Sequence, residues 1–139
     1  MQIALVDDQF YDLHQSEAFL KNYLAQNFSQ IADSIRLYTF LNPQDFLNSF
    51  EPHKFDLFIL DIFMKPLNGI QVAQVIRKRD KDASIIFLTS SEDFILEGYK
   101  VFAVGYFLKP FADNAEQFNE TFSFVFQKLL ANQKILPSR

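Results

Sequence analysis

The stretch IALVDD, residues 3–8, passes from an apolar run directly into two adjacent carboxylates. Its first four residues form a continuous apolar segment of the kind found in a parallel strand that is covered on both faces. Asp7 and Asp8 follow where the chain leaves the core. Two unit charges ~4 Å apart repel each other by ~4 kcal/mol at an effective dielectric constant of ~20. The two carboxylates therefore either point into water or bind a cation between them.

The same transition from an apolar run to polar residues recurs further along the chain. Three segments share it, namely FDLFILD (55–61), SIIFLTSS (84–91) and VGYFLKPF (104–111). They carry Asp61, Thr89 and Lys109 at or near their ends. Another strand is predicted over 35–40, and apolar residues at helical spacing follow each of the five strands. This alternation predicts an α/β fold with a doubly wound, five-stranded parallel sheet and helices on both faces.

Composition limits the class of protein. The chain has 139 residues, 49% of them hydrophobic, which predicts one globular domain. Eighteen phenylalanines predict a core dominated by aromatic packing. The net charge of −4 argues against direct contact with nucleic acid or an anionic membrane. Because the sequence has no cysteine, no evident signal peptide and no apolar run near the ~20 residues of a membrane span, we expect a soluble cytoplasmic protein.

Local signals place the ends of the domain and of some helices. The helical pattern stops near residue 131, so we expect the domain to cover 1–131 and the tail NQKILPSR (132–139) to begin a linker or to fray. Asn42 before Pro43 indicates a helix cap and the first helical residue. Asp12 and Gln15 resemble a capping box for the first helix.

Polar side chains follow four different strands, and in doubly wound sheets ligands bind outside the carboxyl ends of the strands. The residues at these ends are Asp7, Asp8, Asp61, Thr89 and Lys109. Taken singly, each is more often a turn, cap or surface residue. Together, three carboxylates at one edge require a cation, and oxygen ligands favour Mg²⁺ or Mn²⁺ over zinc. Lys109 and Thr89 would then clamp a phosphoryl group. His14 and His53 have no such company, and we expect both on the surface.

These residues resemble the receiver domain of two-component response regulators. The matching pieces are VDD (6–8), DLFILDIFM (56–64) with Gly69, LTSS (88–91) and GYFLKPF (105–111). Each is weakly specific, but their order and spacing together are highly specific and cover residues 1 to about 130. The segment EGYKVFAVGYFLKPF (97–111) also looks like receivers that are attached to LytTR-type DNA-binding domains.

The resemblance implies a role for each matching residue. Asp61 would accept a phosphoryl group from the phosphohistidine of a sensor histidine kinase. Lys109 would pair with that group, Thr89 would donate a hydrogen bond to it, and Tyr106 would swing inward as Thr89 moves. The implied ligands of Mg²⁺ (or Mn²⁺) are Asp7, Asp8, Asp61 and the backbone carbonyl of Phe63.

The loop after the phosphoacceptor departs from the family pattern. Family members usually have proline directly after the position of Met64, where this chain has Lys65 and then Pro66. Gly69 keeps its usual offset from Asp61, so we expect an altered loop around an intact site.

Two side chains near the site bear on how long a phosphoryl group would persist. Phe63 and Ser91 stand two residues after the acceptor and the threonine, and neither offers a carboxylate or amide to orient an attacking water. We therefore expect a long-lived phosphorylated state, with the ring of Phe63 as a shield. The alternative is that this ring only packs on neighbouring loop residues.

Three other functions fit parts of this pattern. A phosphohydrolase of the haloacid dehalogenase type also uses Asp, Mg²⁺, Thr or Ser, and Lys, but it needs a second Asp two residues after its nucleophile. Phe63 and Gln9 occupy that place after Asp61 and Asp7. A receiver-like adaptor would act without phosphorylation, which the complete set of acidic residues expected at the strand ends disfavours. A nucleotide-binding module is disfavoured because three glycines cannot form a glycine-rich phosphate loop.

The sequence thus predicts a phosphorylation-dependent regulatory switch rather than an enzyme that turns over an external metabolite. Its expected partners are a sensor histidine kinase and a second copy of the chain, bound through the fourth helix, fifth strand and fifth helix. We expect DNA to be contacted only through an output domain outside this chain. A stand-alone receiver remains the other possibility.

Overall fold

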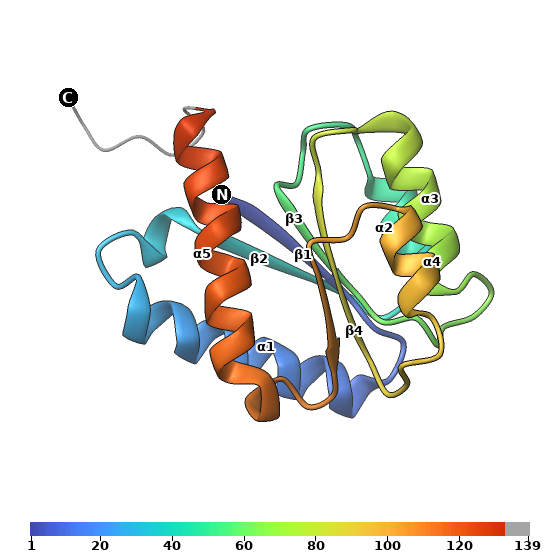
Figure 1. Ribbon diagram of the computed structural model, residues 1–139, viewed down its shortest axis with the longest axis horizontal. Coiled ribbons are helices and arrows are strands. Elements are labelled where there is room, and N and C mark those ends of the chain that lie inside the picture. Colours follow the sequence, from blue (N-terminus) through green and yellow to red (C-terminus); the bar gives the residue numbers. More distant parts are fainter. Residues whose placement is uncertain (133–139) are drawn as a thin grey trace.

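Five parallel strands form the central layer of the molecule. This computed structural model describes residues 1–132. Its strands are β1 (Gln2–Val6), β2 (Arg36–Phe40), β3 (Leu57–Leu60), β4 (Ser84–Thr89) and β5 (Gly105–Leu108). They pair in the order β2-β1-β3-β4-β5, all in parallel (Figure 1). The predicted fold class is confirmed.

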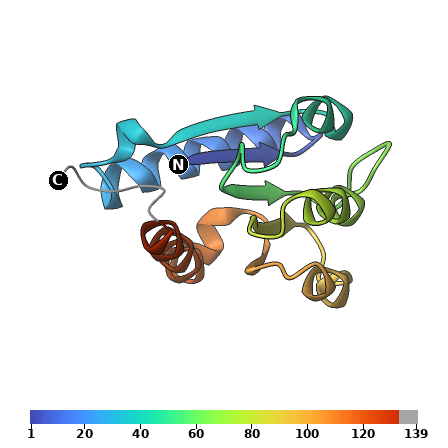
Figure 2. The ribbon, with the colours of Figure 1, turned by 90° about the horizontal axis from the view of Figure 1, so that it is seen from above.

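Helices cover both faces of this sheet. One face carries α1 (Phe10–Asn27) and α5 (Ala115–Ala131), and the other carries α2 (Pro43–Ser49), α3 (Gly69–Arg79) and α4 (Ile95–Lys100) (Figure 2). Two short 3₁₀ helices, η1 (Ala32–Ser34) and η2 (Phe111–Asn114), complete the elements of the described residues. Successive residues of a strand point to opposite faces. In β1, accordingly, Ile3 and Leu5 join the core under α1 and α5, while Ala4 and Val6 join the other core.

Aromatic rings fill both cores, as the phenylalanine content predicts. Under α5, the rings of Phe118 and Phe122 pack against Tyr23 of α1 with centroids 5.1 and 5.5 Å apart. Under α2, the ring of Phe46 meets that of Phe58 edge-on at 5.8 Å. Such pairs contribute ~0.5–1.5 kcal/mol each beyond the area they bury. The apolar stripe of α5 is therefore what fixes this helix on the sheet.

The two predicted helix starts have different outcomes. Asn42 caps α2 as expected, because its side-chain oxygen accepts hydrogen bonds from the backbone of Gln44 and Asp45. The capping box expected from Asp12 and Gln15 is wrong. Helix α1 begins at Phe10 and has no side-chain cap, so Asp12 already lies inside its first turn.

Gly69 is required where α3 begins. A Cβ atom there would overlap the backbone carbonyl oxygen of Asp61, which cannot move without displacing the end of β3. The Gly69 N–H instead donates to the Ile62 carbonyl at 2.9 Å. Glycine at this position thus lets α3 approach the strand that carries the acidic residue.

At the carboxyl-terminal end, α5 ends at Ala131. The tail expected over 132–139 lies outside the described residues, apart from Asn132. Among the helices that the structure describes, none is long and apolar enough to cross a membrane.

Candidate functional site

The polar residues predicted at the strand ends lie close together at the carboxyl ends of the strands. Parallel pairing places Val6 beside Leu60 and Thr89 beside Leu108, so the residues that follow each pair are neighbours. The last residue of β3, Leu60, pairs with Phe87, two residues before the end of β4. Oxygen atoms from Asp7, Asp8 and Asp61 all lie within 4.8 Å of one another. Asp61 follows β3 and is 4% exposed, with its backbone N–H bonded to the Val6 carbonyl at 2.9 Å. We call the site formed by Asp7, Asp8 and Asp61, together with Lys109 and Thr89, the acid pocket.

Lys109 is the cation at the centre of the acid pocket. Its Nζ lies 2.8 Å from Asp7 Oδ2 and 3.4 Å from Asp61 Oδ2. The backbone N–H of Lys109 donates to the Thr89 carbonyl at 2.8 Å, which fixes the start of the side chain beside β4. One ammonium group thus neutralises part of the charge of two buried carboxylates.

Asp12 is a member of the pocket that sequence reasoning missed. Its Oδ2 accepts a hydrogen bond from Lys109 Nζ at 2.8 Å, as short as the Lys109–Asp7 contact. The residue lies in the first turn of α1, where an acidic side chain resembles a helix cap. A third acidic residue so close to the two of the VDD motif was the available signal. It predicts a helix cap and a pocket residue equally well.

Burial and mutual repulsion shift the pKa values of these groups. Burial, reinforced by the charge of Asp7, raises the pKa of Asp61 from 3.8 to about 6, although Lys109 opposes the shift. Burial also raises the pKa of Asp7. For Lys109, burial alone would lower the pKa, but hydrogen bonds to Asp12 and Asp7 and the nearby carboxylate charges raise it above its ordinary value. At neutral pH the pocket therefore holds a charged lysine among carboxylates that are costly to keep ionised.

Three buried oxygen atoms in the pocket have no hydrogen-bond partner among the described residues. They are Asp8 Oδ1, Asp61 Oδ1 and Thr89 Oγ1. Unpaired buried polar atoms are rare and need an explanation. The other oxygen of Asp8 accepts a long bond from the Lys65 N–H at 3.2 Å, so the altered loop reaches the pocket through its backbone. A hard divalent cation fits this set, because free carboxylate oxygens are the ligands that it prefers.

Tyr106 lies beside the loop that follows Thr89. Its hydroxyl donates to the Ser91 carbonyl at 2.6 Å, and its ring packs near Phe87 with centroids 6.0 Å apart. Burial raises the pKa of this hydroxyl, so it stays a donor at neutral pH. The predicted inward swing of Tyr106 stays a prediction. The contact with Ser91 nevertheless joins β5 to the β4–α4 loop.

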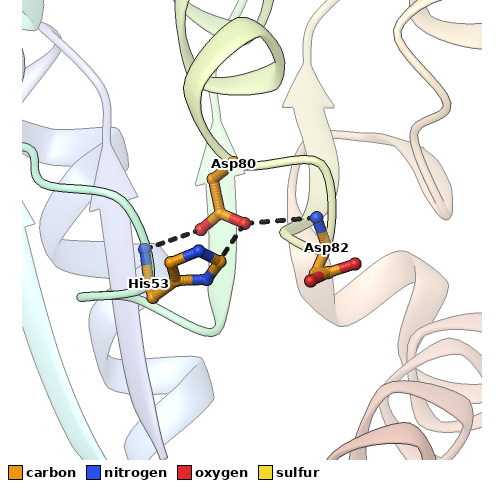
Figure 3. A group of neighbouring side chains, drawn as sticks. All are labelled: His53, Asp80 and Asp82. Atoms are coloured by element: carbon orange, nitrogen blue, oxygen red, sulfur yellow. Dashed lines mark hydrogen bonds and ion pairs between the residues drawn. The ribbon is translucent and has the colours of Figure 1, made fainter.

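A second cluster of possible ligands lies in the loops that lead into the amino ends of β3 and β4. His53, Asp80 and Asp82 face one another there (Figure 3). Both oxygens of the buried Asp80 carboxylate are already bonded, one to the His53 N–H at 2.9 Å and the other to the Asp82 N–H at 3.2 Å. We therefore assign this cluster the role of joining two loops. The predicted exposure of His14 and His53 is confirmed, although His53 has Asp80 as a neighbour 3.5 Å from its Nδ1.

Comparison with known sequences points to one family. The model of the response regulator receiver domain matches residues 3–118. The sensory transduction protein LytT of Oceanobacillus iheyensis is 34% identical over 68% of this chain and 38% of its own length. The positive alginate biosynthesis regulatory protein of Pseudomonas aeruginosa is 33% identical over 79% of this chain and 42% of its own length. The chain thus spans about two fifths of these curated relatives. The name LytT supports the LytTR-type resemblance.

Solved structures agree with this result. The BeF3-activated receiver domain of DrrB is 25% identical, with a TM-score of 0.65 over 88% of this chain and 97% of that one. The response regulator TrrA of Thermotoga maritima, in complex with Mg²⁺-BeF, is 28% identical, with a TM-score of 0.63 over 89% and 97%. A two-component response regulator from Clostridium difficile has a TM-score of 0.72 over 93% and 98% at 18% identity, which bears on the fold alone.

Proposed function

The chain belongs to the response regulator receiver domain family, and we propose that Asp61 is its phosphoacceptor. The observation that carries the proposal is the environment of one atom. Asp61 Oδ1 is buried and has no hydrogen-bond partner within residues 1–132, while the other oxygen of the same carboxylate lies 3.4 Å from Lys109 Nζ. A carboxylate held in this way has one oxygen free to form a bond and a cation to neutralise the incoming group.

The proposed reaction transfers a phosphoryl group from a phosphohistidine. An oxygen of Asp61 forms a bond to phosphorus, and the bond between phosphorus and the histidine nitrogen breaks, with its electron pair going to the nitrogen. With a pKa of about 6, Asp61 is mostly ionised at pH 7 and can act as the nucleophile. Lys109 is positioned to attract the transferred oxygens. The Thr89 hydroxyl has no hydrogen-bond partner in the part of the chain that the structure describes, so it is available to bond to the phosphoryl group.

The proposed metal ligands are the three carboxylates at the strand ends together with a backbone carbonyl of the loop after β3. They are Asp7, Asp8, Asp61 and the carbonyl of Phe63. When bound, Mg²⁺ (or Mn²⁺) would offset the repulsion between the carboxylates and the incoming phosphoryl group. The Mg²⁺-BeF complex of TrrA supports this assignment by relationship.

The donor that we propose is a protein, namely a sensor histidine kinase. Large apolar side chains are exposed beside the acid pocket, including Phe10 and Tyr11 at the start of α1 and Phe63 after β3. Binding of a small phosphodonor would leave these side chains exposed, whereas docking of a protein surface would bury them. The chain itself turns over no external metabolite in this proposal, and its only chemistry is its own phosphorylation and dephosphorylation. The absence of cysteine supports a cytoplasmic location.

The proposed output of the switch is a change in association. Movement of Thr89 toward the phosphoryl group would release space that Tyr106 fills, and both border the face formed by α4, β5 and α5. This face exposes Tyr99 (79%), Phe102 (74%) and Phe124 (53%). We propose that a second copy of the chain covers it after phosphorylation. Control of transcription would then pass through an output domain outside this chain, as the lengths of the relatives suggest.

The test is phosphorylation by acetyl phosphate with MgCl₂, followed by intact-mass and peptide mass spectrometry. We expect one added phosphoryl group, located on Asp61. Asp61→Asn should take up none, because the amide is not a nucleophile. Asp33→Asn, which changes an exposed aspartate of η1, is the matched control and should behave like the parent. A phosphoryl group on another residue would refute the assignment.

A further inference from the structure

A groove of about 480 Å³ lies at the amino ends of β4 and β5, which is the opposite end of these strands from the acid pocket. It is bounded by the end of α3, by the residues just before β4 and β5, and by the last turns of α5. Its lining side chains are Arg77, Lys81, Ala83, Phe102, Val104 and Lys128. Pockets that hold small molecules have volumes of roughly 300–1,000 Å³, so the groove is large enough for such a ligand.

The groove is basic although the chain as a whole is acidic. Three of its lining residues are cations and none is an acid, whereas the net charge of the chain is −4. None of Arg77, Lys81 and Lys128 forms an ion pair with a carboxylate of residues 1–132. Cations gathered in a hollow attract an anion, because the protein walls focus their field. The charge of the lining therefore favours an anionic ligand.

Arg77 fixes the wall of the groove. Its Nε donates to the Val101 carbonyl at 3.0 Å and its Nη1 to the Ala83 carbonyl at 2.6 Å, which joins the residues after α4 to those before β4. Burial lowers the pKa of Arg77, and the charges of Asp80 and Asp82 oppose that shift. Most of its N–H groups are thus occupied, so Arg77 contributes charge and rigidity rather than new hydrogen bonds.

The two lysines have N–H groups left for a ligand. Lys128 Nζ donates to the Asp82 carbonyl at 2.8 Å, which uses one of its three donors. Lys81 is exposed, and its ammonium group has no partner within residues 1–132. Two ammonium groups match the two charges of a phosphate monoester better than the single charge of a carboxylate.

Phe102 gives the groove an aromatic side. Its φ is +58°, a conformation that a bulky side chain rarely adopts, and the residue is 74% exposed. The backbone is held in this conformation, because the Phe102 N–H donates to the Tyr99 carbonyl at 2.9 Å and Arg77 Nη2 donates to the Phe102 carbonyl at 3.4 Å. The ring packs on no other ring of residues 1–132. Strain and exposure both cost stability, so folding alone does not account for a phenylalanine here.

We propose that this groove binds a phosphate monoester that carries a flat aromatic ring, as a nucleoside monophosphate does. The phosphate binds the ammonium groups of Lys81 and Lys128, and the ring stacks on Phe102. Such a site needs no glycine-rich loop, because side chains rather than backbone N–H groups hold the phosphate. A second copy of the chain on the face of α4, β5 and α5 would account for the exposed ring, but not for the unpaired cations beside it.

Isothermal titration calorimetry with AMP, in EDTA and without MgCl₂, tests the site while the acid pocket holds no cation. We expect saturable binding at one site per chain, weakened by added NaCl. Lys81→Gln and Lys128→Gln should each weaken it about 5- to 10-fold. Lys78→Gln is the matched control, because it removes the same charge from an exposed position of α3 outside the groove. It should bind AMP like the parent.

Replacing the ring tests the stacking contact. Phe102→Asn should fold at least as well as the parent, because asparagine tolerates a positive φ, and it should weaken AMP binding about 5- to 150-fold. Phe102→Tyr keeps a ring and should keep the parent affinity. Adenosine and inorganic phosphate each offer half of the ligand, and both should bind more weakly than AMP.

Several results would overturn the site. They are the absence of saturable AMP binding by the parent, parent affinity in both lysine variants or in Phe102→Asn, and inorganic phosphate that binds as tightly as AMP. A single-stranded oligonucleotide that binds more tightly than AMP would also overturn it, because the lining has free ammonium groups for one phosphate only. Failure of Asp61 to accept a phosphoryl group would refute the proposed function and leave these results unchanged, because no residue of the acid pocket lines the groove.

Discussion

Replacing Asp61 by asparagine should stabilise the metal-free protein at neutral pH, although it removes the proposed phosphoacceptor. The pKa of Asp61 is raised from 3.8 to about 6, chiefly by burial and then by the charge of Asp7. Each pKa unit corresponds to ~1.36 kcal/mol, so the ionised carboxylate costs the folded state up to ~3 kcal/mol. Protonation of either Asp7 or Asp61 lowers the electrostatic cost of keeping the other ionised. We therefore expect Asp61→Asn to raise the free energy of unfolding by ~1–3 kcal/mol.

The sign of the pH dependence follows from the direction of this shift. The folded state holds the proton of Asp61 more tightly than the unfolded state does, so protonation favours folding. The cost is absent below pH 3.8 and complete above about pH 6. Relative to Asp61→Asn, the parent should therefore lose free energy of unfolding as pH rises from 4 to 6. The raised pKa of Asp7 acts in the same direction.

Urea denaturation in EDTA, followed by far-ultraviolet circular dichroism at pH 4.0 and 7.5, measures this difference. Asp33→Asn should change stability by less than ~0.5 kcal/mol at both pH values, because it alters an exposed surface residue. Added MgCl₂ should narrow the gap between the parent and Asp61→Asn, because a cation bound only to the folded parent stabilises it. A variant no more stable than the parent at pH 7.5, or equally more stable at pH 4.0, would refute the electrostatic account.

Three further predictions concern the same pocket. Saturable binding of Mg²⁺, followed by tyrosine fluorescence or NMR shifts, should be lost in Asp8→Ala but not in Asp33→Asn; binding that survives would remove the metal site. Gly69→Ala should lower the free energy of unfolding by ~1–3 kcal/mol in urea titrations, because its Cβ overlaps the Asp61 carbonyl. Lys109→Met should cost ~3 kcal/mol at pH 7.5 and less at pH 4, since it leaves two buried carboxylates without their cation; an equal loss at both would contradict this reasoning.

Much of this architecture follows from the sequence alone. Runs such as IALV and LFIL are apolar enough to be buried on both faces, and the polar residues that follow them must then meet at the carboxyl ends of a parallel sheet. The acid pocket of Asp7, Asp8, Asp61 and Lys109 is predictable for that reason. The cap at Asn42 is equally local, because it depends only on a side chain and the two N–H groups that follow.

Other features depend on packing between distant segments. The Asp12–Lys109 contact joins residues 97 positions apart, and the Tyr106–Ser91 bond needs a particular separation of β5 from the β4–α4 loop. The ring contact of Phe63 with Phe94 likewise depends on the course of two loops that no periodicity describes. A sequence pattern reports which face of an element is apolar. The partner of an individual side chain is settled only when helices and loops pack, because alternative partners differ by about 1 kcal/mol.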